Sequence, residues 1–309
     1  MQIGSKIYIA GHLGLVGSAI VRALQKQSYT NLVTRTRQEL DLLDNSAVKT
    51  FFETKKLEYI FLAAAKVGGI MANSTYPADF IYQNLAVQNN IIHNAYLNKA
   101  KKLLFLGSSC IYPRNCPQPI KEEYFMTGEL EPTNEAYATA KIAGIAMCQA
   151  YNRQYGTNFI SLMPTNLYGS NDNFDLESSH VLPALIRKFH EAKMNQAEAV
   201  TLWGTGKVKR EFLHVDDLAE ACLFLMDKYN DSGIINVGTG EDIAIKNLAE
   251  MIKRIVGYDG KIIWDQTKPD GTPRKFLDIS RINGLGWQYK INLETGIRTT
   301  YEWFKKKYE

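Results

Sequence analysis

Tyr137 and Lys141 form the pair whose types and spacing point most directly to chemistry. They stand four residues apart in the run Tyr-Ala-Thr-Ala-Lys, and residues at that spacing share one face of a helix. A neighbouring ammonium should lower the pKa of the phenol from its reference value of about 10, which would make it a usable proton donor or acceptor near neutral pH. Ser108 and Ser109 close the strand expected before this helix, where a hydroxyl could orient a carbonyl group during its reduction. The alternative is that Tyr137 and Lys141 lie on a helix surface that faces solvent or a second subunit.

Three glycines, Gly11, Gly14 and Gly17, follow the first expected strand and open the first expected helix. That context is the one a dinucleotide-binding turn requires. Gly11 would make the tight turn, Gly14 would let the backbone approach a pyrophosphate, and Gly17 would let the helix pack closely on the sheet. The helix N-terminus would then hold the phosphate charge. The alternative is an ordinary glycine-rich connection between a strand and a helix.

Two arginines stand where an NAD enzyme usually has an acidic residue at the end of its second strand. An Asp or Glu about 20 residues after the glycine turn would accept hydrogen bonds from the ribose hydroxyls. This corner instead reads Thr-Arg-Thr-Arg, with Arg35 and Arg37. Guanidinium groups bind a 2′-phosphate well, so the sequence favours NADPH over NADH. Alternatively, both are surface arginines on a turn.

The elements that must position these residues alternate in the order of a βαβ sheet. The run at 59–65, Tyr-Ile-Phe-Leu-Ala-Ala-Ala, is nearly all apolar, as a central parallel strand buried on both faces should be. Strands are expected at 6–10, 31–34, 59–65, 102–107 and 158–163, and helices at 15–26, 46–55, 77–98 and 134–155.

The pattern becomes irregular after Pro164, which indicates a second, smaller unit. The fold class is therefore α/β: a doubly wound Rossmann sheet over residues 1–163, with parts of 212–240 crossing back, and a smaller α/β substrate-binding domain over 164–309. Asp216 and Asp217 stand where the cap of a helix is expected. The expected helices of this half are 180–194, 215–229, 246–256 and 293–307, and its strands are 200–203, 234–237 and 261–264.

Composition excludes several classes of protein. With 309 residues, 45% hydrophobic and 22% charged, the chain is neither disordered, collagen-like nor a coiled coil. The net charge of +4 is too small for a nucleic-acid binder with a strong basic footprint. Cys110, Cys116, Cys148 and Cys222 form no C-x-x-C pair and no zinc-finger spacing, so no metal is expected. Without an apolar leader or a membrane-spanning run, we expect a cytoplasmic protein with reduced thiols and neither a membrane nor a nucleic-acid partner.

Motifs typical of a known family run along nearly the whole chain in a fixed order. They are Gly-Ser-Ser-Cys-Ile-Tyr-Pro at 107–113, the pair Tyr137 and Lys141, Pro-Thr-Asn-Leu-Tyr-Gly at 164–169, His-Val-Leu-Pro at 180–183, Trp-Gly-Thr-Gly at 203–206, Arg-Glu-Phe-Leu-His-Val at 210–215 and Lys-Pro-Asp-Gly-Thr-Pro-Arg-Lys at 268–275. With them the chain closely resembles the GDP-L-fucose synthase family, the GDP-4-keto-6-deoxy-D-mannose 3,5-epimerase-4-reductases among the extended short-chain dehydrogenases. The glycine turn is common to all extended short-chain dehydrogenases, whereas Ser-Ser-Cys combined with His180 is the discriminating feature.

The resemblance implies the roles of five catalytic residues. In a 4-keto sugar the hydrogens on C3 and C5 are both α to the carbonyl, so inversion needs groups that lose and regain protons near neutrality. The resemblance gives these roles to Cys110, as the base, and His180, as the acid. Ser108 and Tyr137 would stabilise an enolate at O4, and Lys141 would hold the nicotinamide ribose. Taken alone, Cys110 would fit a small buried hydrophobic position, and His180 could cap the helix that it opens.

The resemblance also implies the binding residues, NADPH as cofactor and a homodimer. The substrate would be GDP-4-keto-6-deoxy-D-mannose, and the subunits would pair through the helices near 80–96 and 137–155, where Ile81, Leu85, Ile92 and Tyr96 are compatible with an interface. Cofactor contacts are expected from Gly11, His12, Leu13, Gly14, Leu15, Val16, Gly17, Arg37, Leu106, Gly107, Ser108, Ser109, Lys141, Pro164, Thr165, Asn166, Leu167 and His180. Substrate contacts are expected from Lys188, Trp203, Arg210, Asp270 and Lys275.

Two departures from the family pattern concern binding rather than chemistry. Leu13 stands where the family has an arginine in the glycine turn, so selectivity for NADPH would rest on Arg35 and Arg37. Lys188 stands where an arginine is also known. The rival interpretations are another nucleotide-sugar epimerase or dehydratase of the same fold and a non-catalytic NADPH-binding regulator. A regulator predicts loss of Tyr137 or Lys141, and both are present.

Overall fold

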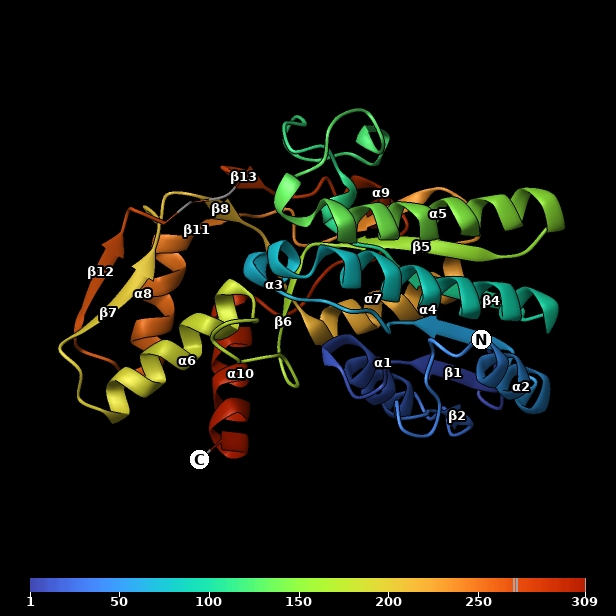
Figure 1. Ribbon diagram of the computed structural model, residues 1–309. Coiled ribbons are helices and arrows are strands. Elements are labelled where there is room, and N and C mark those ends of the chain that lie inside the picture. The colour runs from blue at the N-terminus through green and yellow to red at the C-terminus, as the bar shows by residue number, and fades with distance from the viewer. Residues whose placement is uncertain (269, 271, 309) are drawn as a thin grey trace.

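The computed structural model describes residues 1–268, 270 and 272–308. Within them, a parallel sheet with helices on both faces is joined to a smaller group of helices and short strands (Figure 1). Residues 269 and 271 of the motif at 268–275 lie outside the described part.

The large sheet is built from short apolar segments. Among the described residues its order is β10-β5-β4-β3-β1-β2, and every neighbouring pair is parallel. β1, β4 and β5 are buried throughout, as a sheet covered on both faces requires. The strands are β1 (Ile7–Ala10), β2 (Leu32–Val33), β3 (Tyr59–Leu62), β4 (Lys102–Leu106), β5 (Phe159–Pro164) and β10 (Ile234–Val237).

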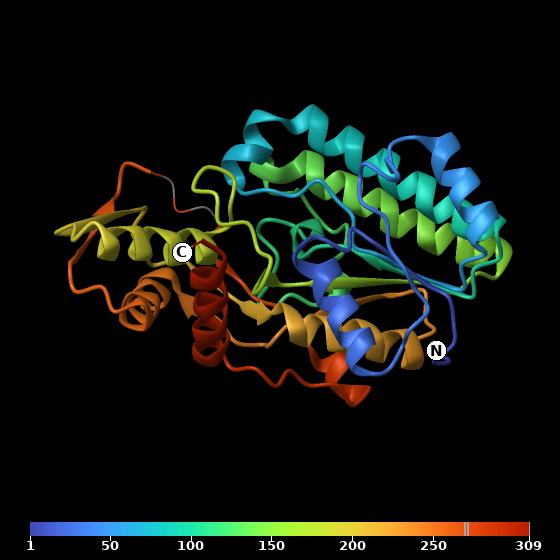
Figure 2. The ribbon, with the colours of Figure 1, turned by 90° about the horizontal axis from the view of Figure 1, so that it is seen from below.

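Helices cover the two faces of this sheet in separate groups. α1 (Leu15–Lys26) and α7 (Val215–Lys228) pack on one face, whereas α2 (Asn45–Lys55), α4 (Pro77–Leu97) and α5 (Glu135–Tyr155) pack on the other (Figure 2). Ile7 and Ile9 belong to the first core, and Tyr8 and Ala10 belong to the second. Because successive side chains of a strand point to opposite faces, β1 contributes to both cores.

The smaller part has a core of its own, formed by helices and a pair of strands. α6 (Val181–Met194), α8 (Ile245–Val256) and α10 (Leu293–Tyr308) pack there beside the parallel pair β7 (Ala199–Trp203) and β12 (Lys261–Asp265). Short strands join the two parts: β6 (Asn166–Tyr168) pairs with β9 (Phe212–His214), and β8 (Lys209–Arg210) lies between β11 (Ile243–Ala244) and β13 (Arg274–Lys275).

Every helix expected from the sequence is present, with ends within one or two residues of those expected. The short strands β6, β8, β9, β11 and β13 and the helices α3 (Ile70–Thr75) and α9 (Ser280–Gly284) were not expected. The expected cap of α7 is wrong: His214 is the N-cap and its ring accepts a hydrogen bond from the backbone N–H of Asp216 at 3.2 Å, while Asp216 and Asp217 lie in the first turn. The domain boundary at 163 and 164 stays a prediction. No helix within the described residues is long and apolar enough to cross a membrane.

Candidate active site

Helix α5 carries Tyr137 and Lys141 toward the carboxyl end of β4. The Lys141 ammonium donates a hydrogen bond to the backbone oxygen of Leu106 at 2.7 Å and lies 5.7 Å from the centre of the Tyr137 ring. Lys141 is 4% exposed, and burial lowers its pKa to about 8. The edge of the Tyr137 ring packs against Phe80 of α4, with the ring centres 6.3 Å apart. The pair therefore faces the protein rather than solvent.

The expectation that Lys141 lowers the pKa of Tyr137 is wrong in this structure. Burial and the neighbouring Cys110 thiol raise the pKa of Tyr137, and its hydrogen bond with Ser108 acts in the opposite direction. The Lys141 ammonium is instead directed to the Leu106 carbonyl. Tyr137 consequently keeps its proton at neutral pH, which suits a proton donor.

Ser108 and Cys110 form a compact pair just after β4. Ser108 caps the short helical turn Ser109–Ile111, where its hydroxyl accepts a hydrogen bond from the Cys110 backbone N–H at 3.3 Å. The Ser108 hydroxyl and the Cys110 thiol share a second hydrogen bond at 2.6 Å. Cys110 is partly exposed and unpaired. A thiol in direct contact with a hydroxyl and open to solvent is available for proton transfer.

The other cysteines have different surroundings. Cys148 and Cys222 are fully buried, and burial raises the pKa of Cys148 to about 12 and that of Cys222 still further. Cys116 is a free thiol whose pKa is also raised by burial. Thiols of this kind stay protonated at neutral pH, unlike a general base.

His180 stands at the N-terminus of α6, where its side chain is accessible to solvent. His180 is the N-cap residue of α6, as the alternative of a helix cap had it, but its side chain makes no cap hydrogen bond with the described residues. Partial desolvation by the neighbouring protein and the nearby Lys275 ammonium lower the pKa of His180. Lys275 also interacts electrostatically with Cys110 and Arg210. The structure therefore gathers Cys110, His180 and the cations of the smaller part around one place.

The glycine turn has the geometry of a dinucleotide site. Gly11 has φ +84°, and a Cβ there would lie 2.8 Å from the backbone nitrogen of Ala64. A Cβ on Gly17 would lie 2.1 Å from the Gly11 oxygen, so α1 packs directly on the turn. Gly14 is exposed, and a Cβ there would come no closer than 3.5 Å to the same oxygen. Among the described residues no side chain caps α1, so the N–H groups of its first turn suit an anion such as pyrophosphate.

The remaining expected cofactor residues lie at the same edge of the sheet, because the carboxyl ends of parallel strands meet there. Leu106 ends β4 and residues 107–109 follow it, and residues 164–167 end β5 and begin β6. The Thr165 hydroxyl and the Asn166 side-chain amide both donate hydrogen bonds to the backbone oxygen of Glu211, at 3.3 and 2.7 Å. Leu13 is exposed beside the turn, with His12, Leu15 and Val16 around it.

The two arginines after β2 differ in their surroundings. Arg35 donates a hydrogen bond to the Thr34 oxygen at 2.6 Å and lies 5.7 Å from the centre of the Phe51 ring. Arg37 is exposed, with Asp41 at 3.9 Å as an ion-pair partner. An exposed pair at that distance is weak, which leaves the Arg37 guanidinium free to reorient toward a phosphate.

The expected substrate residues lie on elements of the smaller part and on the short strands that join it to the large sheet. Arg210 and Lys275 are neighbours on the paired strands β8 and β13. Lys188 of α6 lies 6.0 Å from the centre of the exposed Trp203 ring. The carboxylate of Asp270 accepts hydrogen bonds from the backbone N–H and hydroxyl of Thr205, both at 2.7 Å, and so fixes the turn after Trp203.

Glu211 is an organising residue that the sequence did not single out. It is fully buried, and its carboxylate accepts hydrogen bonds from the backbone N–H groups of Thr239, Gly240 and Leu277 at 2.6–2.8 Å. Burial raises its pKa. Its backbone holds Thr165 and Asn166, and its neighbour is Arg210. The one sequence signal that could have pointed to Glu211 is its position next to Arg210 in the Arg-Glu-Phe run.

Known proteins match this chain over nearly its full length. The model of the NAD dependent epimerase/dehydratase family matches residues 7–238. The putative GDP-L-fucose synthase 2 of Arabidopsis thaliana is 62% identical over 98% of this chain and 93% of that protein, and the GDP-L-fucose synthase of Escherichia coli is 54% identical over 97% and 96%. A solved structure, a GDP-mannoheptose C4 reductase from Campylobacter jejuni with NADP bound, superimposes with a TM-score of 0.91 at 47% identity, covering 99% of each chain. The chain therefore belongs to the NAD dependent epimerase/dehydratase family and, within it, to the GDP-L-fucose synthases.

Proposed function

We propose that this protein converts GDP-4-keto-6-deoxy-D-mannose into GDP-L-fucose by inverting C3 and C5 and then reducing C4 with NADPH. One observation carries the proposal: the reductase group of Ser108, Tyr137 and Lys141 is in direct contact with Cys110, a thiol that a reductase alone does not need. The identity of 62% to a putative plant GDP-L-fucose synthase supports the same activity.

The epimerisation rests on Cys110 and His180. Removal of a proton from C3 or C5 leaves an enolate, whose oxygen at C4 would accept hydrogen bonds from Ser108 and Tyr137. The Cys110 thiolate takes the proton as base and becomes a thiol, and the His180 imidazolium returns a proton to the opposite face and becomes neutral. Partial desolvation and the Lys275 ammonium lower the pKa of His180, so its imidazolium form is a stronger acid but is the minor form at neutral pH.

The reduction uses the other members of the site. NADPH, when bound, would supply the hydride for C4. Tyr137, whose raised pKa keeps it protonated, donates the proton that O4 takes up. The Lys141 ammonium, held beside the Leu106 carbonyl at the end of β4, would hold the nicotinamide ribose.

The GDP moiety would bind to the smaller part of the molecule. Arg210 and Lys275, neighbours on paired strands, provide adjacent positive charges for the diphosphate. Lys188 adds a third cation beside Trp203, whose exposed indole offers a flat apolar wall. Asp270 contributes by fixing the turn at Thr205.

A second candidate is a C4 reductase that performs no epimerisation on its GDP-4-keto sugar. The 47% identity to the Campylobacter jejuni GDP-mannoheptose C4 reductase favours it. The two candidates differ in proton chemistry, because a simple reductase leaves the hydrogens on C3 and C5 in place.

The test is the purified protein with GDP-4-keto-6-deoxy-D-mannose and NADPH in D2O. We expect NADPH consumption and deuterium at C3 and C5 of the product. Cys110→Ser should stop deuterium incorporation while NADPH still binds, and Tyr137→Phe should lose reduction first. NADPH consumption without deuterium would favour the simple reductase, and neither signal would refute both candidates.

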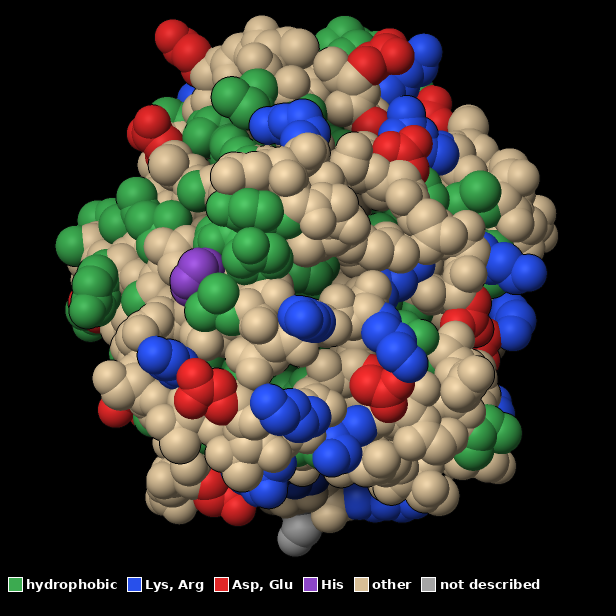
Figure 3. Space-filling view, turned by 90° about the vertical axis from the view of Figure 1, so that its right-hand side faces the viewer, with side chains coloured by type: hydrophobic (Ala, Val, Ile, Leu, Met, Phe, Trp, Pro, Cys, Tyr) green, Lys and Arg blue, Asp and Glu red, His purple; other side chains and the backbone are tan. Residues whose placement is uncertain are grey.

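We also propose that the protein is a homodimer that pairs through α4 and α5. Ile92, which the sequence left compatible with an interface, is not available for one, because it is fully buried in the core between α4 and the sheet. Tyr82, Leu97 and Tyr155 are instead exposed on these helices, at 68%, 49% and 45%. Figure 3 shows hydrophobic side chains gathered beside a histidine on one end of the molecule. Sedimentation of the wild type as a dimer and of Leu97→Asp as a monomer would support this pairing.

A further inference from the structure

The segment at 169–180 joins β6 to α6 and ends in His180. Within the described residues, two hydrogen bonds hold it against the dinucleotide-binding half. The side-chain amide of Asn171 donates a hydrogen bond to the Ser18 hydroxyl at 3.1 Å, and the Ser178 oxygen accepts one from the Gly69 backbone N–H at 2.9 Å. The segment that presents His180 is therefore fastened to α1 at one end and to the loop after β3 at the other.

Asn171 combines two properties at the first of these contacts. Its φ of +67° lies in the left-handed region, which asparagine tolerates better than most residues because its short polar side chain bonds locally. The backbone thus turns sharply two residues after Gly169, and the side-chain amide reaches back to α1. The backbone conformation and the hydrogen bond can be separated experimentally, because glycine at position 171 keeps the left-handed conformation but has no side chain to donate the hydrogen bond.

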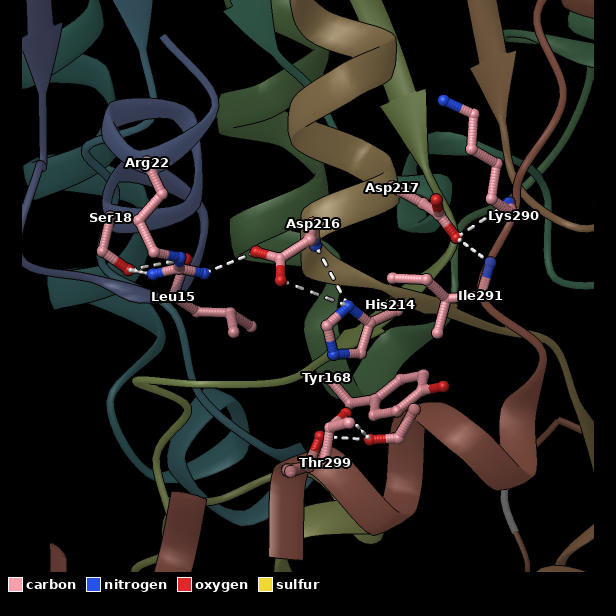
Figure 4. A network of polar contacts seen from close by, with 12 residues as sticks. Leu15, Ser18, Arg22, Tyr168, His214, Asp216, Asp217, Lys290, Ile291 and Thr299 are labelled. Carbon is pink, nitrogen blue, oxygen red and sulfur yellow. Dashed lines mark hydrogen bonds and ion pairs between the residues drawn. The ribbon is translucent and has the colours of Figure 1, made fainter. Parts of the chain in front are cut away.

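Ser18 is itself fixed by a chain of polar contacts (Figure 4). Its hydroxyl donates to the Leu15 oxygen at 3.1 Å, in the first turn of α1, and accepts a hydrogen bond from Arg22 at 3.3 Å. Arg22 in turn donates to the Asp216 carboxylate of α7 at 2.6 Å. Asn171 therefore binds a hydroxyl that is anchored to the turn of α1 where the pyrophosphate would lie.

We propose that Asn171 is a positioning residue that couples the dinucleotide-binding turn of α1, through Ser18, to the placement of His180. The inference rests on the proposed function for the role of His180, but the coupling itself is a property of the chain. A cofactor that orders the first turn of α1 orders Ser18, and through Asn171 it orders the segment that ends in His180. His180 is thus positioned for proton transfer when NADPH is bound.

The first experiment measures this coupling without chemistry, by amide hydrogen exchange with NADP⁺ as the probe. In the wild type, NADP⁺ should protect both the start of α1 and residues 172–180. In Asn171→Gly, which keeps the left-handed backbone, protection of α1 should remain and that of 172–180 should be lost. Ser18→Ala should behave in the same way, and Ser170→Ala, one residue earlier in the segment, should match the wild type. Equal protection of 172–180 in Asn171→Gly and wild type would overturn the proposal.

The second experiment measures deuterium incorporation into the GDP-4-keto sugar. Asn171→Gly and Ser18→Ala should each lower kcat for exchange by at least about tenfold, since a misplacement on the order of 1 Å costs about a hundredfold. KM for the sugar should stay within about twofold, because neither residue binds it. The double variant should be no slower than either single one, since both remove the same contact. If the losses in kcat of the two single variants multiply in the double variant, the coupling is refuted. If NADP⁺ protects residues 172–180 of the wild type but the wild type exchanges no protons of the sugar, the proposed function alone is refuted.

Discussion

Asp172→Asn should stabilise the protein at alkaline pH. Asp172 is 8% exposed; one carboxylate oxygen accepts a hydrogen bond from the Asn173 backbone N–H at 2.8 Å, and the other is buried without a partner in the described part of the chain. Burial raises its pKa from 3.8 to about 7. The folded state therefore holds this proton more tightly than the unfolded chain, so stability falls as pH rises from about 4 to 7.

The size of the effect follows from that pKa. A difference of about 3 pKa units at about 1.4 kcal/mol each sets an upper bound of about 4 kcal/mol above pH 7. Asparagine mimics the protonated carboxyl, keeps the acceptor for Asn173 and carries no charge. The variant should thus match the wild type near pH 4 and exceed it by up to about 4 kcal/mol at pH 8.

Urea unfolding of both proteins at each pH from 4 to 8 measures this difference, and subtracting the two curves removes the contributions of all other groups. Asp175→Asn is the matched control in the same segment. Hydrogen bonds from Ser178 lower the pKa of Asp175, so that substitution should destabilise the protein at neutral pH. A difference between Asp172→Asn and wild type that does not change with pH would refute the reasoning.

Two further predictions concern packing and helix capping. Gly17→Ala should cost about 1–3 kcal/mol of stability, since its Cβ would meet the Gly11 oxygen at 2.1 Å. A Cβ at Gly14 has room, so Gly14→Ala should keep the wild-type stability in thermal unfolding. The same variant should bind NADPH more weakly in a titration. Lys102→Met should cost at least about 2 kcal/mol in urea unfolding, because the buried ammonium donates hydrogen bonds to the backbone oxygens of Leu225, Met226 and Tyr229 at the end of α7; a variant as stable as wild type would contradict that role.

The long periodic elements could be predicted from the sequence because their signals are local. The helix expected at 15–26 is α1 with the same ends, and the strand expected at 234–237 is β10. Strands of two or three residues, such as β8 and β13, have no period to detect. They form where distant segments meet, and that meeting is what brings Arg210 beside Lys275.

The candidate site was predictable where motif and element coincide, as at Tyr137 and Lys141. Their protonation was not, because the pKa of Tyr137 depends on burial and on Cys110, which come from other elements. The cap of α7 failed for a similar reason: two aspartates gave a strong local signal, but the chain enters the helix from β9, so His214 occupies the capping position. Contacts such as that of Asn171 with Ser18, 153 residues apart, leave no local trace.

The place of β10 in the sheet has a consequence for synthesis. β10 pairs with β5 at one edge, and α7, the helix just before it, covers the same face as α1. About three quarters of the chain must therefore be synthesised before the dinucleotide-binding half is complete. A fragment that stops near residue 163 would leave the edge of β5 unpaired and α1 uncovered by α7, so we expect it to aggregate rather than bind NADPH.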